Sequence, residues 1–248
     1  LRYFIQLSYN GSNFHGWQRQ NNANSVQQTL EESMSVIQGC DILVVGAGRT
    51  DTGVHARKMI AHFDAEALKF HLDDFTFKLN QLLPRSISVI NIRAVKNDSH
   101  ARFDAISRTY YYYIHQVKDP FDYPFHYYYK ENLDWKIMNK ASKILMNHQD
   151  FECFSKSNTD VKTFECHIEE AFWEVNKNGA VFKITANRFL RNMVRAIVGT
   201  LIEIGLGKKD INDLKQILIS KKRSNAGYSV PANGLFLYNI KYPKSIFK

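Results

Sequence analysis

Cysteine is scarce in this chain, and its spacing excludes two common roles. There are three cysteines among 248 residues, at positions 40, 153 and 166, and no two of them form a closely spaced pair. An odd number without paired spacing argues against a disulfide framework and against a zinc site. We therefore expect reduced, structural thiols, a cytoplasmic protein and no bound metal.

Long apolar runs and low-complexity segments are also lacking. No stretch approaches the length of a membrane span, and the first residues do not follow the pattern of a signal peptide. The glycines at 46, 48 and 53 miss the Gly-x-Gly-x-x-Gly spacing of a dinucleotide site. The sequence thus favours a globular protein that needs no cofactor.

What the chain does have is apolar and basic residues. Apolar residues make up 44% of it and aromatic residues 13%, and the net charge is +9. The charge is uneven, with +2 in residues 1–103 and +7 in residues 104–248. A basic surplus favours a polyanionic partner, because each neutralised phosphate releases counterions. The alternative interpretation is that the charge only aids solubility.

Hydrophobic periodicity predicts an α+β fold whose first half alternates strands and helices. The expected strands are 1–9, 42–45, 58–65 and 87–95, and the expected helices are 26–37 and 75–82. Strand, helix, strand, strand, helix, strand is the order of a ferredoxin-like or RNA-recognition-like half. We place this first domain at residues 1–103.

The second domain, residues 104–248, contains the same kinds of element. The expected strands are 108–114, 168–175, 180–186 and 235–242, and the expected helices are 135–146, 190–201 and 211–218. The first of these strands carries four consecutive tyrosines, 110–113, so two of them face each side of the sheet. A tyrosine presented beside a reactive loop could stack on an extruded base.

The densest cluster of chemically active residues is the loop 46–56, Gly-Ala-Gly-Arg-Thr-Asp-Thr-Gly-Val-His-Ala. Its three glycines allow sharp turns and close approach of another molecule. Arg49 and Asp51 place a guanidinium and a carboxylate two residues apart. We interpret Asp51 as a reactive group, with a charged surface turn as the alternative. The sequence leaves open whether His55 contacts a ligand or only packs.

A second cluster is basic. Arg188, Arg191 and Arg195 have the spacing of one edge of the predicted helix 190–201. Such a helix could hold phosphate and pair with a carboxylate, or simply present a solvated basic face. Further candidates for phosphate contacts are Lys208, Lys209, Lys221 and Lys222, which flank the helix 211–218.

Together these motifs resemble the tRNA pseudouridine synthase A family, in the family's order and over nearly the whole chain. The matching segments are 9–11, 16–20, 46–56, 79–84, 100–103, 108–110, 189–199 and 233–235. The Gly-Arg-Thr-Asp core of the loop 46–56 is the most specific of them.

The resemblance implies roles for five residues. Asp51 matches the family's catalytic aspartate, Arg49 the arginine that helps hold the displaced nucleotide, and Tyr110 the tyrosine that stacks on the target base. Arg195 matches the arginine that pairs with the aspartate, and Leu235 the apolar residue that borders the base.

The resemblance also implies the fold, the partners and the substrate. It implies two ferredoxin-like halves around a mainly antiparallel sheet with a central basic cleft. It further implies a homodimer without metal or cofactor, an isomerase acting on uridines 38, 39 and 40 of the tRNA anticodon stem-loop. Two departures are Thr52, where alanine is common, and Thr109, where a basic residue is common and could contact phosphate.

Two other classes of function remain open. Asp51-Thr52-Gly53 is also the tripeptide of aspartic proteases, in which two copies in a dimer could share a proton. Arg49-Thr50 stands where that class expects apolar residues. A non-catalytic RNA-binding module would explain the charge and the aromatic residues but not the Asp51 loop.

Overall fold

The structure is a computed structural model that describes residues 1–156 and 161–248. Within these residues the fold is α+β and its strand pairings are mainly antiparallel, as the sequence predicts. The chain divides into two compact units. Unit 1 comprises Leu1–Ile106 and Phe236–Lys248, and unit 2 comprises Ser107–Leu235. The predicted domains 1–103 and 104–248 differ from these units in where they place residues 104–106 and 236–248.

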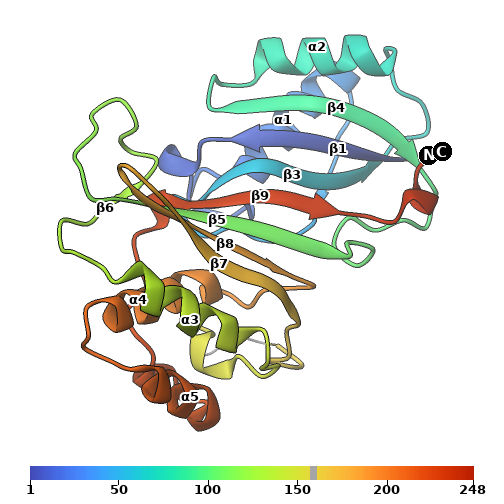
Figure 1. Ribbon diagram of the computed structural model, residues 1–248. Helices are drawn as coiled ribbons and strands as arrows, with labels where there is room; N and C mark the ends of the chain where they lie inside the picture. The colour runs from blue at the N-terminus through green and yellow to red at the C-terminus, as the bar shows by residue number, and fades with distance from the viewer. Residues whose placement is uncertain (157–160) are drawn as a thin grey trace. The chain divides into compact units, whose positions relative to one another are not determined.

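Unit 1 has the strand order of a ferredoxin-like sheet (Figure 1). Its elements are β1 (Arg2–Tyr9), α1 (Val26–Gln38), β2 (Val45–Gly46), β3 (His55–Asp64), α2 (Leu72–Leu82), β4 (Ile87–Val95) and most of β9 (Leu235–Lys241). The antiparallel order is β4-β1-β3, and β2 pairs with β3. β9 adds to the start of β3 as a parallel strand.

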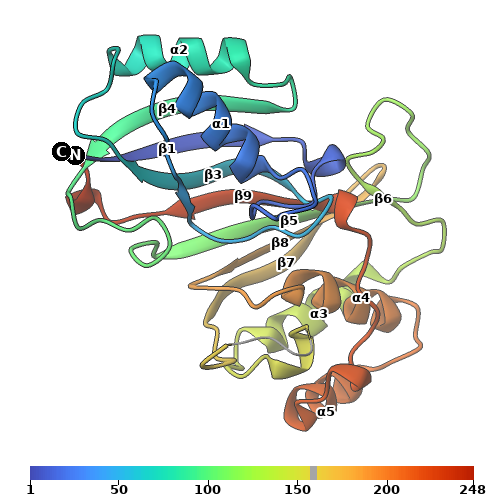
Figure 2. The same ribbon diagram turned by 180° about the vertical axis from the view of Figure 1, so that it is seen from behind.

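The two faces of this sheet differ because side chains alternate along each strand. In β1 the apolar set Tyr3, Ile5, Leu7 and Tyr9 is buried, whereas Gln6 and Ser8 are partly exposed. Helices α1 and α2 lie over one face of the unit 1 sheet (Figure 2). Their buried stripes, which include Leu30 and Leu79, form the core of unit 1.

Helix α1 begins and ends as its sequence predicts. The Ser25 hydroxyl accepts a hydrogen bond from the backbone N–H of Gln28 at 3.3 Å, which satisfies one unpaired donor of the first turn. Gly39 ends the helix with φ of 79°, a left-handed conformation that glycine adopts without steric cost.

The predicted strand 42–45 is wrong for most of its length. Only Val45 and Gly46 form a strand, paired with His62 and Ala61 of β3. Ile42 and Val44 are buried while Leu43 is exposed, so the segment alternates like a strand without pairing over its length. One reason is that the Val44 N–H donates to the Glu31 carboxylate of α1 instead of to a neighbouring strand.

Unit 2 repeats part of the same arrangement. Its elements are β5 (Ser107–His115), β6 (Tyr127–Tyr128), α3 (Trp135–Leu145), β7 (Ile168–Asn176), β8 (Gly179–Ala186), α4 (Met193–Gly205) and α5 (Ile211–Ser220). The antiparallel order is β5-β8-β7, with β6 parallel to β5. The predicted hairpin is confirmed, because β7 and β8 pair over their length through a tight turn.

The predicted helix 190–201 starts later than expected. Helix α4 begins at Met193, after Asn192 adopts a left-handed conformation with φ of 67°. Asn tolerates this conformation better than most residues, and its side chain donates to the Ser229 hydroxyl at 2.6 Å. Arg188 and Arg191 therefore precede the helix, and the prediction that three arginines share one helix edge is wrong.

Nearly every residue of α4 is buried, from Met193 to Gly205. Gly199 is required at one close contact, because a Cβ there would lie 1.8 Å from the Tyr228 carbonyl oxygen. No helix in the described part of the chain is long and apolar enough to cross a membrane.

Candidate active site

The loop that carries Asp51 is held in place through its neighbours. The Thr50 hydroxyl is hydrogen-bonded to the Tyr9 hydroxyl at 2.8 Å, and the Thr50 carbonyl accepts from the Trp17 N–H at 3.2 Å. The Asp51 carbonyl accepts from the Val54 N–H at 3.1 Å, which closes a turn. Asp51 itself is partly buried. Its backbone is therefore fixed on both sides of the carboxylate.

Two glycines outside the loop allow it to pack against the start of the chain. A Cβ on Gly11 would lie 2.0 Å from the Val54 carbonyl oxygen, and one on Gly16 would lie 2.3 Å from the Thr50 carbonyl oxygen. Gly16 also has φ of 88°, which disfavours other residues. The Asp51 loop thus packs directly against the segments 9–11 and 16–20.

A chain of hydrogen bonds connects Arg49 to the interior of α1. The Arg49 Nε donates to Gln18 Oε1 at 3.1 Å, and Gln18 Nε2 donates to Gln27 Oε1 at 2.9 Å. Gln27 Nε2 donates in turn to Glu31 Oε1 at 3.0 Å. The Glu31 carboxylate is 3% exposed and also pairs with Arg19 at 3.1 Å.

This chain restricts the orientation of the Arg49 guanidinium. Sequence reasoning missed it. A signal was present, since Gln27 and Glu31 are four residues apart on α1, and Glu31 follows Leu30 of the buried stripe.

His55 packs inside unit 1. Its side chain is 1% exposed, its Nδ1 accepts from the Gly11 N–H at 3.0 Å, and its ring stacks on Phe236 at 4.6 Å between centroids. A side chain so enclosed supports the loop from beneath. The question that the sequence left open is answered in favour of packing.

In unit 2 the tyrosines of β5 divide between core and surface. Tyr112 is fully buried and its hydroxyl donates to the Pro231 carbonyl at 2.8 Å. Tyr110 is partly exposed, and its ring meets that of Phe189 edge to face at 5.0 Å. Thr109 is buried, with its hydroxyl bonded to that of Thr185 at 2.9 Å. At this position the side chain points into the unit, so Thr109 offers no phosphate contact.

Arg195 lies in the first turn of α4 and is tied to the segment 230–235. Its Nε donates to the Val230 carbonyl at 2.7 Å, and the Val230 N–H donates back to the Arg195 carbonyl at 3.3 Å. The same segment contacts β5, because a Cβ on Gly234 would lie 2.9 Å from the Tyr112 ring. Leu235 follows and is 6% exposed. The segment thus links the helix of Arg195 to the strand of Tyr110.

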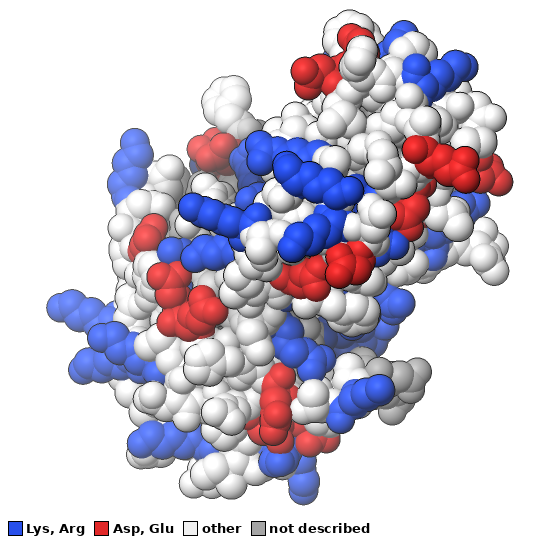
Figure 3. Space-filling model, turned by 90° about the vertical axis from the view of Figure 1, so that its right-hand side faces the viewer, with Lys and Arg blue, Asp and Glu red and all other residues white. Residues whose placement is uncertain are grey.

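The remaining basic candidates fall into two groups. Lys209 pairs with Glu203 at 3.5 Å, Lys221 pairs with Asp150 at 2.5 Å, and the Arg188 Nη1 donates to the Thr163 carbonyl at 3.3 Å. Arg191, Lys208, Lys221 and Lys222 are exposed. On the face drawn in Figure 3, basic side chains lie in groups with acidic side chains between them.

The other chemically notable groups are structural in character. Burial raises the pKa of Cys153 to about 12 and that of Cys166 to about 11, so both remain thiols at neutral pH. Within residues 1–156 and 161–248, no three His, Cys, Asp or Glu side chains gather as a metal ion would require.

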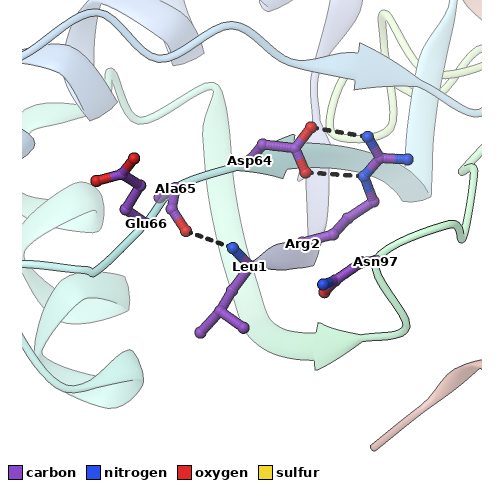
Figure 4. A pocket seen from close by; sticks show the side chains of 6 residues that line it. All are labelled: Leu1, Arg2, Asp64, Ala65, Glu66 and Asn97. Carbon is purple, nitrogen blue, oxygen red and sulfur yellow. Dashed lines mark hydrogen bonds and ion pairs between the residues drawn. The ribbon is translucent and has the colours of Figure 1, made fainter.

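A small, open pocket at the start of β1 is lined by an ion pair. Arg2 donates to both oxygens of Asp64 at 2.8 and 2.7 Å, and the Leu1 nitrogen donates to the Ala65 carbonyl at 2.9 Å (Figure 4). Its lining also includes Glu66 and Asn97, and it contains no serine, cysteine or histidine.

Comparison with known proteins identifies the family. The model of the family described as tRNA pseudouridine synthase matches residues 6–104 and 141–243. The chain belongs to the tRNA pseudouridine synthase family. Its relatives in this family include proteins named tRNA pseudouridine synthase A from Porphyromonas gingivalis, 51% identical with 99% of both chains covered, and from Parabacteroides distasonis, 50% identical with 99% and 98% covered. A more distant one, from Acetivibrio thermocellus, is 37% identical with 95% and 97% covered.

The residues that the family model matches include most, but not all, of the candidate site residues. The matched ranges contain Arg49, Asp51, Arg195 and Leu235, whereas Tyr110 lies between them. The α+β fold with a mainly antiparallel sheet is that of the family.

Proposed function

We propose that this protein isomerises uridine to pseudouridine at positions 38, 39 and 40 of the tRNA anticodon stem-loop, with Asp51 as the essential carboxylate. The observation that carries the assignment to this carboxylate is the loop on which it lies. The loop falls within the residues that the family model matches. Contacts with Tyr9, Trp17, Gly11 and Gly16 fix it against the rest of unit 1. A reacting group on a rigid loop loses little entropy when the substrate binds.

The reaction needs few components. The bond from N1 of uracil to C1′ of the ribose breaks, and a bond from C5 to C1′ forms. The hydrogen at C5 leaves as a proton and N1 gains a proton, so no electrons are exchanged with an external partner. A carboxylate, an aromatic platform and cations for the phosphates are the groups that this sequence of steps requires.

The other roles follow the family resemblance and the local geometry. Arg49 holds the displaced nucleotide, and the hydrogen-bond chain through Gln18 keeps its guanidinium ready for that contact. Tyr110 stacks on the target base, with Phe189 fixing its ring from the side. From the family resemblance, Arg195 takes the role of the arginine that pairs with the catalytic aspartate, and Leu235 that of the apolar residue that borders the base.

Contacts to the tRNA backbone are assigned to Arg188, Arg191, Lys208, Lys209, Lys221 and Lys222. Arg191, Lys208, Lys221 and Lys222 are exposed, which suits this role. Lys209 and Lys221 must first exchange their partners Glu203 and Asp150, which weakens their net contribution. We place the enzyme in the cytoplasm as a homodimer.

The deciding experiment is release of tritium from tRNA labelled at uridine C5. Forming the C5 bond expels that hydrogen, whereas binding or proteolysis cannot. We expect release by the native chain, no detectable release by Asp51→Asn, and retained tRNA binding by that variant. Asp41→Asn, an exposed acid ten residues earlier in unit 1, is the matched control and should release tritium at the native rate.

Two results would contradict the proposal. Tight tRNA binding without release by the native chain would indicate an RNA-binding module. Release by Asp51→Asn at the rate of Asp41→Asn would show that another group performs the chemistry.

A further inference from the structure

A pocket of about 500 Å³ lies on the second face of the unit 1 sheet. This is the face opposite to the one on which Ile5 and Leu7 of β1 are buried. Four strands contribute to it: β1 through Gln6, β3 through Lys58, β4 through Arg93 and β9 through Lys241. None of its lining residues belongs to the loop 46–56 or to the basic candidates of unit 2.

The charge of this pocket is of one sign. Lys58, Arg93 and Lys241 line it, and no aspartate or glutamate does. Burial and the positive charge of Arg93 lower the pKa of Lys58. Like charges that line one pocket repel one another, and a bound anion offsets this repulsion. The charge of its lining therefore favours binding of an anion.

Amide and aromatic groups complete the lining. Gln6, Asn91 and Asn239 supply neutral donors and acceptors, and the Lys58 Nζ donates to Asn239 Oδ1 at 2.9 Å. This hydrogen bond holds the ammonium group against the sheet. Tyr242 is fixed by a hydrogen bond from its hydroxyl to the Ala101 carbonyl at 2.5 Å, and its ring meets that of Phe4 at 5.2 Å.

The strands that carry the cations are spread across the sheet. Arg93 lies on β4 and Lys241 on β9, and in the order β4-β1-β3-β9 these strands are three spacings apart. At about 4.8 Å per spacing, the backbones of the two strands are separated by about 14 Å. Such a row of cations across rigid strands matches successive phosphates of a nucleic-acid strand, and the amides match its sugars and base edges.

We propose that this pocket binds the phosphodiester backbone of the tRNA substrate, as a contact surface separate from the catalytic loop. The inference rests on the proposed function for the identity of the RNA. It assigns to Lys58, Arg93 and Lys241 a role in holding the substrate, and none in the chemical step.

The test compares two triple variants that remove the same charge. Lys58→Gln, Arg93→Gln and Lys241→Gln empty the pocket of its cations. Lys69→Gln, Lys78→Gln and Arg85→Gln, all exposed and located before, within and after α2, serve as the matched control. The dissociation constant for unmodified tRNA is measured from about 50 to 300 mM salt, and thermal unfolding of all three proteins verifies that each is folded.

We expect the plot of log affinity against log salt to be shallower by about two to three in the pocket variant, since each lost phosphate contact lowers the slope by about 0.7 to 0.9. In the control variant, the slope of log affinity against log salt should differ from the native slope by no more than about one. In the tritium assay the pocket variant should raise KM at least tenfold and leave kcat within about threefold.

Other results would overturn the inference. A slope equal to that of the control variant would show that the pocket does not contact the RNA. If free uridine monophosphate or inorganic phosphate bound the pocket as tightly as tRNA does, and displaced the tRNA, the pocket would be assigned to a small anion instead. Because the slope is measured by binding alone, a chain that bound tRNA through this pocket but released no tritium would fail the proposed function and support this inference.

Discussion

His62 shows how the sheet of unit 1 controls a single ionisable residue. The imidazole is 5% exposed, and its Nδ1 accepts from the Ala101 N–H at 3.2 Å. Burial, the charge of Arg2 and the neighbouring His100 lower the pKa of His62 to about 4. The folded protein thus keeps this residue neutral at physiological pH, as its acceptor role requires.

The depressed pKa predicts a pH dependence of stability. Between pH 6.5 and 4 the unfolded chain binds a proton at His62 and the folded chain does not, so the free energy of unfolding rises with pH across this window. Lowering the pH from 7 to 5 should cost about 2 kcal/mol through this residue, at 1.36 kcal/mol per pKa unit. Urea unfolding at both pH values measures the loss.

The control for this prediction is His71→Gln, an exposed histidine that should leave the loss unchanged. In His62→Gln, the free energy of unfolding should differ between pH 7 and pH 5 by about 2 kcal/mol less than in the native chain, whatever the effect of the substitution on absolute stability. An undiminished difference in His62→Gln would assign the effect to other groups.

At the level of residues, the sequence singled out the candidate groups but not the contacts that hold Arg49 in place. The density of glycine, charge and histidine singled out the Asp51 loop. The support for Arg49 comes from Gln18, Gln27 and Glu31, which only the folded chain brings into one hydrogen-bonded row. Glutamine and glutamate are common on exposed surfaces, so the residue types alone do not predict that Glu31 is buried.

At the level of elements, this row connects helix α1 to the loop 46–56. Gln27 is its central member, because its amide accepts from Gln18 and from the Arg19 N–H and donates to Glu31 and the Val44 carbonyl. Replacing it with methionine keeps the length of the side chain and removes all four hydrogen bonds. Several buried or half-buried partners are then left unsatisfied, at about 1 to 3 kcal/mol for each buried group.

We expect Gln27→Met to lower kcat/KM about tenfold, because a loss of about 1.4 kcal/mol in the placement of Arg49 corresponds to that factor. Gln28→Met on the same helix is the control, since Gln28 bonds through its amide only to the exposed Glu32 in the described contacts. Steady-state tritium release measures both. If Gln27→Met remained additive with Arg49→Ala in the double variant, the effect would not pass through Arg49.

Element boundaries failed where a backbone conformation or a side-chain contact replaced the regular pattern. The spacing of Arg188, Arg191 and Arg195 is helical, but the left-handed Asn192 interrupts it before α4 begins. The period of Ile42 to Val45 is that of a strand, but Glu31 takes the hydrogen bond that a partner strand would have made. In both cases a residue distant in sequence, Ser229 or Glu31, stabilises the irregular conformation.

At the level of the whole molecule, the order of elements predicted the ferredoxin-like sheet of unit 1 but not its last strand. Residues 236–248 return to unit 1, where Phe236 pairs with His55 of β3 and the Lys96 N–H donates to the Ile246 carbonyl at 3.0 Å. A strand pattern at the end of the chain does not reveal which sheet it joins. Long-range pairing of this kind is set by side-chain packing, which periodicity does not encode.

This return predicts that unit 1 cannot fold from residues 1–106 alone. Phe236, Leu237, Ile240 and Ile246 are each no more than 6% exposed. Burying such side chains contributes about 1.5 to 3 kcal/mol each, so their loss approaches the total stability of an ordinary domain. We expect the fragment 1–106 to lack a cooperative thermal transition. Joining residues 236–248 to it through a Gly/Ser linker of about 20 residues should restore one.

A fragment carrying the same 13 C-terminal residues in scrambled order separates strand pairing from added length. It should behave like 1–106, because the apolar side chains then fall on both faces of any strand that forms. Calorimetry and near-ultraviolet circular dichroism of the three fragments measure the difference. Equal transitions in 1–106 and in the linked fragment would mean that β9 is an accessory strand, and that β4-β1-β3 with its two helices is by itself the folding unit.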